Sequence, residues 1–423
     1  MNNIRSNPKQ NDSTSTRKFE HSVEDAWQQL AQFVNYSQPA ETITLNQAYE
    51  RILYRNITAT LDFPVFTNSA MDGYAYYTDA AFPLDRTLKV IGHSLAGKPY
   101  EGTVGYDECV LITTGAKVPS SCNTVVIKEK VQQHENHIHF QANSNAPGQY
   151  IRYQGEDFKQ GDTLLTKGGV LHAANVGLLA TLGIHEVEVY RPIKIALFST
   201  GDELKEPGTT LLPGQIYDAN RYTIAGLLKK TGAIIEDYGI IADQADQVEH
   251  ALNEATQHAD IIITSGGVSV GEADLVKKAV EKLGELKLWR IKLKPGRPLA
   301  WGKIKDKLFF GLPGNPVSAM VTCYLFVIPA LSKIMGQPDI GRVPKLYARC
   351  AQAITKTVRR MEFQRGIAHV DHSGEFQVKP TGPQDSHRLS SMSQANCFIV
   401  LPEETQHVAQ GESVQIILLS QFL

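Results

Sequence analysis

The sequence predicts a multidomain protein of the α/β plus β class, and three observations support this prediction. The chain has 423 residues, which is too long for one hydrophobic core and indicates roughly two to four domains. Between 191 and 338, strand-like apolar runs alternate with helical periodicity, which is typical of a mainly parallel sheet with helices on both faces. On both sides of this segment, short β-branched runs between turn residues indicate β domains. We therefore expect a three-layer α/β/α domain, a small β domain, a linking helical/β segment and a C-terminal β-barrel-like domain.

The N-terminal part is expected to begin with a disordered tail over 1–20, since this stretch is polar and has no apolar signal core. Ser22 can cap a helix whose apolar face carries Val23, Trp27, Leu30 and Val34. A second helix is predicted over Leu171–Leu182, ending at Gly183. We assign 21–56 and 148–190 together to the linking subdomain.

Residues 57–147 are predicted to form the small β subdomain. Runs such as Leu88–Ile91 and Thr124–Ile127 are rich in β-branched residues and are separated by turns. His134, His137 and His139 could suggest a metal site. Because they flank the polar turn Glu135-Asn136, we prefer a solvent-exposed hairpin.

The α/β subdomain is assigned to 191–338. Strands are expected near 193–198, 233–241 and 260–264, and the helices between them are marked by two sets of residues. These sets are Tyr222, Ala225 and Leu228 before a stop at Gly232, and Val248, Leu252 and Ala255. The apolar run Val317–Leu331 is short for a membrane span and contains Pro329, so a buried helix is expected. Residues 339–423 form the C-terminal β subdomain.

Charge and cysteine content exclude several classes of function. Lys and Arg number 42 and Asp and Glu 44, so a formal charge of −2 gives no general attraction to nucleic acid or to an anionic membrane. The five cysteines are scattered and form no Cys-x-x-Cys pair, which argues against a disulfide framework or a zinc knuckle. A reducing, cytoplasmic compartment is therefore expected.

The segment Thr264–Asp274 is the first candidate site. It follows the apolar run Ile261–Ile263 and precedes a helical pattern that Gly284 is expected to stop. A strand that leads through a glycine-rich turn into a helix presents unpaired N–H groups to an anion. The predicted binding residues are Ser265, Gly266, Gly267 and Ser269. Ser199–Glu203 follows another strand, and ligands of such sheets bind beyond the carboxyl ends of the strands.

Cations gather shortly after this turn. If Trp289–Lys294 is one strand, Trp289, Ile291 and Leu293 point inward while Arg290, Lys292 and Lys294 share the other face. Arg297 follows after the Pro295-Gly296 turn. The functional hypothesis is an oxyanion-binding group, and the alternative is an exposed edge strand whose lysines block aggregation.

The segment Gly311–Pro316 leads into another predicted helix. Asn315 can cap this helix and Pro316 suits its first position. Ser318 lies in the first turn, where the positive end of the helix favours an anion. Taken alone, Pro313–Ser318 is better explained as a stable helix start. With the other motifs, Pro313, Asn315, Pro316 and Ser318 are predicted to bind substrate.

Acidic residues at the same turns are candidate ligands of a divalent cation. Glu203 and Asp274 are the proposed pair, because Mg²⁺ prefers oxygen ligands next to phosphates. Asp274 also suits the first turn of a helix without any function. Asp72 and Asp157 adjoin glycines and are interpreted as turn residues in the first instance.

Seven motifs occur in order along the chain. They are Asn68–Ala75, Thr114–Ala116, Gly155–Asp157, Ser199–Glu203, Ser265–Asp274, Lys294–Pro298 and Gly311–Ala319. Together they closely resemble the molybdopterin molybdenumtransferases, the MoeA family, and are similar to the E domain of gephyrin. The resemblance covers nearly everything after the tail.

The resemblance implies an enzyme that inserts molybdate into adenylylated molybdopterin, with Mg²⁺-assisted release of AMP. It implies an elongated homodimer in which the linking subdomain takes part in dimerisation, and an active cleft between the α/β subdomain of one protomer and the C-terminal subdomain of the other. It also implies transient handover from a molybdopterin adenylyltransferase and to molybdoenzyme maturation factors.

The same resemblance assigns roles by motif position. Asp72, Thr114, Asp157, Glu203 and Asp274 match positions in or near the family's active site. The positions that match the molybdate and phosphate side, or come from the C-terminal subdomain, are Lys294, Arg297, Ser318, Arg365 and Ser386. The family often has lysine where this chain has Arg297, and arginine offers a planar fork instead of a point charge.

Two other functions stay open from the sequence. One is a molybdopterin adenylyltransferase, which shares the Ser-Gly-Gly α/β module but mostly consists of that module alone. The other is a gephyrin-like binding scaffold without activity.

Overall fold

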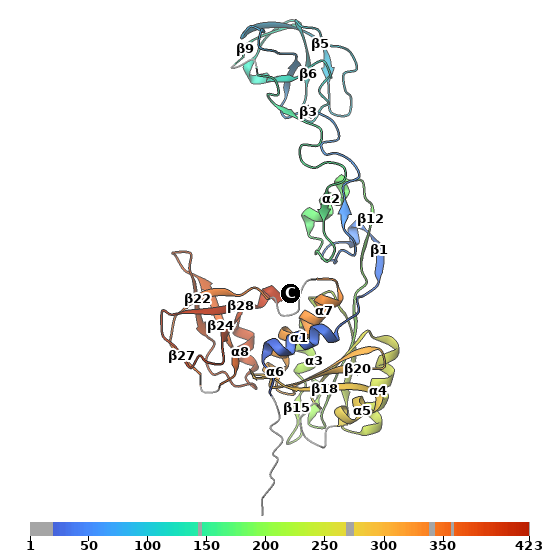
Figure 1. The fold of residues 1–423 in the computed structure, drawn as a ribbon, viewed down its shortest axis with the longest axis vertical. Coiled ribbons are helices and arrows are strands. Elements are labelled where there is room, and N and C mark those ends of the chain that lie inside the picture. Colours follow the sequence, from blue (N-terminus) through green and yellow to red (C-terminus); the bar gives the residue numbers. More distant parts are fainter. Residues whose placement is uncertain (1–19, 143–145, 268–274, 338–342, 357–358, 423) are drawn as a thin grey trace, which may run out of the picture. The chain divides into compact units, whose positions relative to one another are not determined.

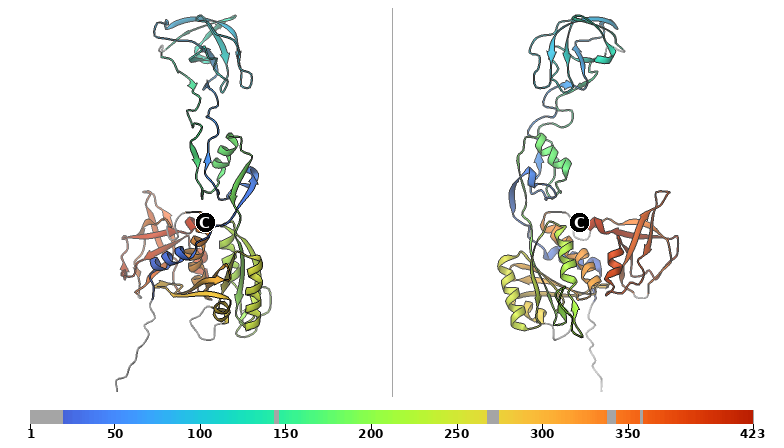
Figure 2. Two further views of the ribbon diagram at one scale, coloured as in Figure 1. Left: turned by 45° about the vertical axis from the view of Figure 1, so that its right-hand side comes forward. Right: turned by 180° about the vertical axis from the view of Figure 1, so that it is seen from behind.

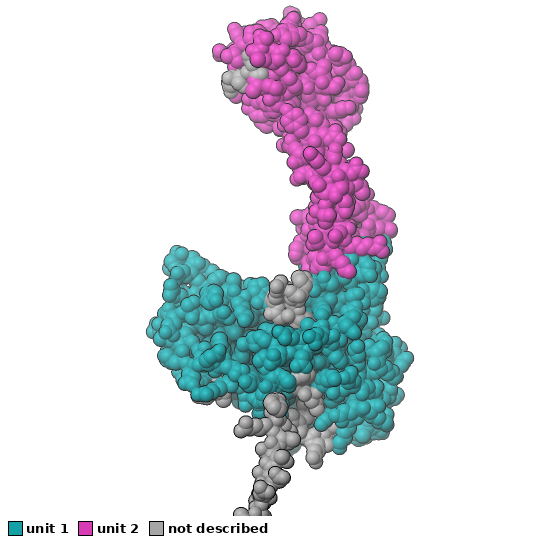
Figure 3. All heavy atoms as spheres, in the orientation of Figure 1, with its two compact units in different colours: residues 1–42, 50–54, 188–423 teal, residues 43–49, 55–187 magenta. Residues whose placement is uncertain are grey.

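The computed structural model describes residues 20–142, 146–267, 275–337, 343–356 and 359–422. The chain forms two compact units (Figure 3). Unit 1 comprises 1–42, 50–54 and 188–423, and unit 2 comprises 43–49 and 55–187. The five-part division expected from the sequence stays a prediction.

Unit 1 contains a six-stranded, mainly parallel sheet. The strand order is β16 (Ile234–Ile241), β13 (Lys194–Thr200), β17 (Ile261–Ser265), β21 (Lys307–Leu312), β20 (Pro298–Ile304) and β18 (Gly284–Arg290). The first four strands are parallel to their neighbours, whereas β20 and β18 join in antiparallel fashion. All residues of β17 are buried, which explains its unbroken apolar run.

Helices cover both faces of this sheet (Figure 1). On one face, α4 (Ala245–His258) and α5 (Leu275–Leu283) pack on Ala196, Phe198 and Ile262. Alternate residues of a strand point to opposite faces, so Ile195 and Leu197 face the other side. They are also fully buried, and α3 (Asn220–Lys229) and α6 (Pro316–Thr322) lie against that side of the sheet. The predicted α/β class with a mainly parallel sheet is confirmed.

The long apolar helix belongs to the interior of unit 1. It runs through α6, a π-helical turn at Cys323–Val327 and α7 (Ile328–Ile334). Most of its residues are buried inside unit 1. The wider turn before Pro329 accommodates a residue that has no backbone N–H to donate. α1 (Val23–Phe33) packs on α7, and Ser22 and Asp25 cap its N-terminus reciprocally.

The C-terminal strands of unit 1 close into a small barrel. β24 (Met361–Val370) pairs with both β25 (Phe376–Pro380) and β26 (Cys397–Leu401), and β22 (Leu346–Cys350) and β28 (Ser413–Leu418) complete the ring. The short strand β19 (Leu293–Lys294) joins β24 in parallel. The predicted barrel-like domain is confirmed.

Unit 2 is built on a second six-stranded sheet. Its order is β7 (Thr124–Ile127), β4 (Gly73–Tyr76), β6 (Glu108–Ile112), β5 (Asp85–Ser94), β9 (His137–Gln141) and β8 (Gln132–His134). Separate apolar clusters around Tyr76 and Ala75, neighbours on β4, show that both faces of the sheet are covered. β8 and β9 form the predicted hairpin.

The remaining elements are short. They are β1 (Ala40–Thr44), β2 (Ile57–Thr58), β3 (Asn68–Ser69), β10 (Ile151–Arg152), β11 (Thr163–Leu165), α2 (Ala173–Thr181), β12 (Glu186–Tyr190), β14 (Leu204–Lys205), β15 (Ile216–Tyr217), β23 (Ile354–Thr355), α8 (Leu389–Gln394) and β27 (His407–Val408), and Figure 2 shows further views.

Two local predictions were wrong. Trp289–Lys294 is not one strand, because β18 ends at Arg290 and Leu293–Lys294 joins the barrel instead. The predicted alternation nevertheless holds over 291–294, where Ile291 and Leu293 are buried. Tyr222, placed on the apolar face of its helix, is exposed, and Ile224, Leu227 and Leu228 form the buried face of α3.

Gly284 was expected to stop α5, and the helix does end at Leu283. The structure gives a different reason for glycine there, because Gly284 is the first residue of β18 and pairs with Ile304 on β20. A Cβ atom at 284 would lie 1.9 Å from the carbonyl oxygen of Lys303. Close approach of two strands therefore requires this glycine.

We expect Gly284→Ala to lower the free energy of unfolding by about 1–3 kcal/mol, because the backbone of β20 has to move. Gly226→Ala in α3 is the matched control. Apart from neighbouring backbone of α3 itself, no atom lies within 4 Å of a Cβ at 226, so this change is expected to stabilise the protein by up to about 1 kcal/mol. Urea unfolding of both variants measures the difference, and equal stability of Gly284→Ala and the wild type would contradict the prediction.

Candidate functional site

Three predicted turns meet at one edge of the unit 1 sheet. β13, β17 and β21 run parallel in register, with Ser199 opposite Ser265 and Ser265 opposite Leu312. The turns after these strands therefore emerge together at the carboxyl edge, where such sheets bind ligands. They are 201–203, 266–267 and 313–315. The sequence analysis placed the first two of these turns at a common edge, and the structure adds the turn 313–315 to that edge.

The Gly266-Gly267 turn has a backbone that only glycine adopts without strain. Both residues have positive φ, 87° and 64°. A Cβ at 266 would lie 2.6 Å from the Thr200 carbonyl oxygen, and one at 267 would lie 2.5 Å from Val276 Cγ2. The Gly266 N–H donates to the Leu312 carbonyl at 3.1 Å, so this amide already has a partner within the protein. Ser269 and Asp274 lie outside the described residues.

The next turn leads into α6 as predicted, with one correction. Asn315 occupies the N-cap position and Pro316 the first helical position, but the Asn315 side chain makes no capping hydrogen bond. Ser318 lies buried in the first turn. The Val317 N–H donates to the Ser386 carbonyl at 3.1 Å, which attaches the C-terminal loop around Ser386 to this helix start.

The cations that follow β18 are each paired with a carboxylate. Lys292 Nζ lies 3.3 Å from Glu403 Oε2, and Lys294 Nζ lies 3.1 Å from Glu362 Oε1. Arg297 pairs with Glu20. His21 holds Glu20 in place, because its N–H donates to Arg290 and its carbonyl accepts from Lys292. A bound oxyanion therefore has to compete with the protein's own acids.

The three pairs differ in how easily they can exchange. The side chains of Lys292 and Arg297 are both 40% exposed, and exposed pairs of this kind contribute about 0–1 kcal/mol. Glu362 is only 2% exposed and its Oε2 has no hydrogen-bond partner. Removing Lys294 would leave this buried carboxylate without its ion-pair partner and with Gln364 Nε2 as its hydrogen-bond donor, which is costly. Lys294 is thus fixed, whereas Lys292 and Arg297 can change partners.

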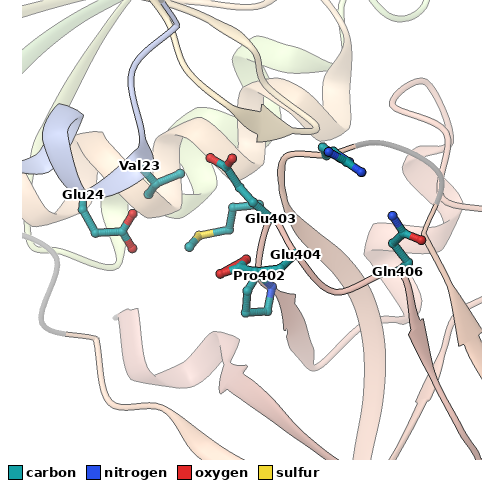
Figure 4. Close-up of a pocket in the computed structure, with 8 residues that line it drawn as sticks. Val23, Glu24, Pro402, Glu403, Glu404 and Gln406 are labelled. Atoms are coloured by element: carbon teal, nitrogen blue, oxygen red, sulfur yellow. The ribbon is translucent and has the colours of Figure 1, made fainter.

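A cavity of about 710 Å³ lies beside these pairs in unit 1 (Figure 4). Glu24 enters it from the start of α1, and Glu403 and Glu404 from the loop after β26. The other lining residues are Val23, Arg359, Met361, Pro402 and Gln406. Three carboxylates facing one guanidinium give this cavity the wrong sign of charge for an oxyanion. It is therefore not the predicted anion site, although Glu403 is the partner of Lys292.

Arg365 supports the loop that carries Ser386. Its side chain is fully buried, with Nε 3.0 Å from Ser391 Oγ and its other nitrogens donating to the carbonyls of Pro383, Gln384 and Asp385. Burial lowers the pKa of this guanidinium to about 10. In this arrangement Arg365 acts through the loop rather than by facing an open site.

Acidic side chains gather at the ends of β13 and β16. Glu203 is exposed and its carboxylate lies over Gly201, where a Cβ would come within 2.6 Å of it. Asp243, which follows β16, was missed by the sequence analysis. Partial burial, together with Asp202 and Glu203, raises the pKa of Asp243. Within the described residues, no three His, Cys, Asp or Glu side chains are arranged to hold a metal ion.

In unit 2 the structure brings Asp72 and Thr114 together. The Thr114 N–H and hydroxyl both donate to Asp72 Oδ1, at 2.7 and 2.9 Å, and these bonds lower the pKa of Asp72. Asp72 therefore connects its own turn to the turn that carries Thr114. Asp157 is exposed, and its N–H donates to the Phe63 carbonyl.

The sequence analysis also missed the buried polar residues at the start of α3. Asp218, Asn220 and Arg221 are nearly inaccessible to solvent, although a run of polar residues at a helix start suggests a solvated cap. Asn220 bonds to both Ser265 and Gly314. Their burial could have been inferred from their position, because they lie at the start of a helix that packs on a buried parallel sheet.

Comparisons with known proteins agree over most of the chain. A family model of the MoeA N-terminal region (domain I and II) matches 21–183. A model of a probable molybdopterin binding domain matches 196–333, and a model of the MoeA C-terminal region (domain IV) matches 347–419.

Individual relatives show the same likeness. A molybdopterin molybdenumtransferase of Haemophilus influenzae is 40% identical over 395 residues, which are 93% of this chain and 97% of that protein. One of a Nostoc species is 34% identical over 90% of this chain and 89% of its own length. The crystal structure of a molybdopterin biosynthesis MoeA protein from Pyrococcus horikoshii superposes with a TM-score of 0.81 at 28% identity, covering 95% of this chain and all of that one. The chain belongs to the MoeA family of molybdopterin molybdenumtransferases.

Proposed function

We propose that this protein inserts molybdate into adenylylated molybdopterin and releases AMP, as a step of molybdenum cofactor biosynthesis. The observation that supports this most strongly is the carboxyl edge of the unit 1 sheet. The Gly266-Gly267 turn, the turn that enters α6, a turn carrying Glu203 and a group of three cations all belong to unit 1 of a chain whose family is established. Two anionic substrates need this combination, since their mutual repulsion has to be offset.

Molybdate is proposed to bind at Lys292, Lys294 and Arg297. Lys294 stays on Glu362 and offers its remaining N–H donors, because an ammonium group has three. Lys292 and Arg297 exchange their exposed carboxylate partners for the incoming oxyanion. Arg297 can then bind two oxygens at once through its planar fork.

The residues at the acidic end of the edge fit a magnesium ion only in part. Glu203 supplies an exposed carboxylate, and Asp243, whose pKa is raised by partial burial and then by Asp202 and Glu203, adds a further acid beside it. Mg²⁺ typically takes one or two carboxylates and keeps several waters, so a complete set of protein ligands is not needed. Glu203 and Asp274 are the proposed ligands, and Asp243 is a neighbouring acid. A bound Mg²⁺ would polarise the phosphate bond and neutralise charge on the leaving AMP.

The protein's own residues then act by positioning and electrostatics. Burial raises the pKa of Cys109, Cys122, Cys323 and Cys397 to about 12, so these thiols are poor nucleophiles. From their motif positions in the family, Asp72, whose Oδ1 accepts from Thr114, and Asp157 are proposed as further functional residues of unit 2.

Lys294→Met is expected to reduce kcat/KM for molybdate about 100-fold, since it removes a fixed positive charge from the oxyanion site. AMP release from adenylylated molybdopterin, followed at increasing molybdate concentration, measures this. Lys307→Met is the control, because Lys307 pairs with Asp306 at the opposite end of β21. Its activity should stay within about twofold of the wild type.

The same assay separates the alternatives. A wild-type protein that releases no AMP, whatever the molybdate concentration, would overturn the proposed function. Formation of adenylylated molybdopterin from ATP and molybdopterin would identify an adenylyltransferase instead. If Lys294→Met releases AMP at the wild-type rate, Lys294 has no role in the mechanism.

We further propose a cytoplasmic homodimer. The unpaired, buried cysteines fit a reducing compartment, and the family resemblance supports the dimer and transient contacts with a molybdopterin adenylyltransferase and molybdoenzyme maturation factors. Light scattering of the purified chain tests the dimer directly, and the mass of a single chain at micromolar concentration would contradict it.

A further inference from the structure

One side chain connects two of the turns at the carboxyl edge. Asn220, the first residue of α3, donates from Nδ2 to Ser265 Oγ at 2.8 Å and to the Gly314 carbonyl at 2.7 Å. A carbonyl can only accept, so the amide nitrogen has to face Gly314. A primary amide carries two N–H groups, and here each has its own acceptor.

The position of this link matters because the strands have already ended. Ser265 is the last residue of β17 and is paired with Leu312, the last residue of β21. The Gly266 N–H still reaches the Leu312 carbonyl, and the chain after Leu312 turns into α6. Asn220 adds a connection beyond the strand ends, from Ser265 to Gly314, two residues after Leu312.

Asn220 itself is held firmly. The Asp218 carboxylate accepts from the Arg221 N–H and Nε, and the Arg221 guanidinium lies 2.6 Å from Asp237 on β16. This fastens the first turn of α3 to the sheet. Because Asn220 is buried, each of its hydrogen bonds is shielded from water and costly to lose.

We infer that Asn220 is a positioning residue, which fixes the Gly266-Gly267 turn relative to the Pro313–Pro316 turn so that both face one bound oxyanionic group. This inference rests on the proposed function. A displacement of about 1 Å at such a site can cost about 100-fold in rate. Asn220 makes no contact with the substrate and acts only through the two turns.

Asn220→Asp tests this with little change in size. The carboxylate can still accept from the Ser265 hydroxyl, but it has no N–H and repels the Gly314 carbonyl. We expect kcat for AMP release per folded molecule to fall at least tenfold, and amide hydrogen exchange at 265–267 and 312–315 to become faster. Asn220→Ala, which removes both bonds, should give effects at least as large.

Gln38→Ala is the matched control. Gln38 is a buried amide whose Nε2 donates to Asp260 Oδ2 at 2.8 Å, next to the start of β17 and thus at the other end of the same strand. It should lose a comparable amount of stability without any change in kcat. If a merely structural role applied to Asn220, its variants would behave like Gln38→Ala.

The measurements distinguish failure of the positioning role from failure of the proposed function. Wild-type kcat in both Asn220 variants, or unchanged exchange at either turn, would overturn the positioning role. A wild-type protein without AMP release would overturn the proposed function, yet exchange at the two turns would still report on the link. If both variants fail to fold, Ser265→Ala probes the same link without altering α3, and unchanged exchange at 312–315 would overturn the inference.

Discussion

Replacement of Arg221 by methionine is expected to lower the free energy of unfolding by about 3–5 kcal/mol. Arg221 is 4% exposed and pairs with Asp218, Asp237 and Glu206. Burial opposes its charge, but the hydrogen bonds that the guanidinium donates to these three carboxylates outweigh burial and raise its pKa. Without the guanidinium, the Asp218 carboxylate, itself 2% exposed, would stay buried and unpaired.

Urea unfolding at neutral pH measures this loss, and Arg349→Met provides the comparison. Arg349 pairs with Glu375, and both side chains are more than half exposed. Such a pair contributes at most about 1 kcal/mol. Similar stabilities of the two variants would show that the group around Arg221 does not depend on its charge.

Gly267→Ala is expected to reduce AMP release about 100-fold while the fold is retained. The methyl group would meet Val276 Cγ2 at 2.5 Å and Thr200 Oγ1 at 2.7 Å, and φ of 64° is unfavourable for alanine. The turn therefore has to move, and its position relative to the bound anion changes.

Initial rates with saturating substrates and a far-UV circular dichroism spectrum test this prediction. Gly226→Ala again serves as control, because, apart from neighbouring backbone of α3 itself, no atom lies within 4 Å of a Cβ at this position. Full activity of Gly267→Ala would mean that the glycine turn does not contact the substrate.

The architecture could be predicted from the sequence because parallel strands buried on both faces leave long apolar runs. Ile261–Ile263 on β17 is such a run. The helix α4 buries one face only, and this gives its sequence a clear helical periodicity. The end of each strand locates the turns, so the placement of Glu203 and Gly266 at one edge followed from topology alone.

The partners of the site residues could not be predicted, since they depend on contacts between distant parts of the chain. Glu403 and Glu20 come from 111 and 277 residues away to pair with Lys292 and Arg297. A sequence window shows the cations but not the acids that offset them. The burial of Arg365 depends in the same way on the closure of the barrel.

Buried polar residues were missed for a related reason. Asn220 and Arg221 belong to a polar run, and such runs usually mark an exposed helix start. Only the packing of α3 on the sheet makes them interior and places Asn220 between two turns.

A crystal structure of the protein with molybdate and AMP tests the central claim most directly. We predict molybdate in contact with Lys294 and at least one of Lys292 and Arg297, with the carboxylate of Glu403 or Glu20 displaced. The AMP phosphate should lie at the turns after β17 and β21. Molybdate bound elsewhere, with all three cations still on their carboxylates, would contradict the account.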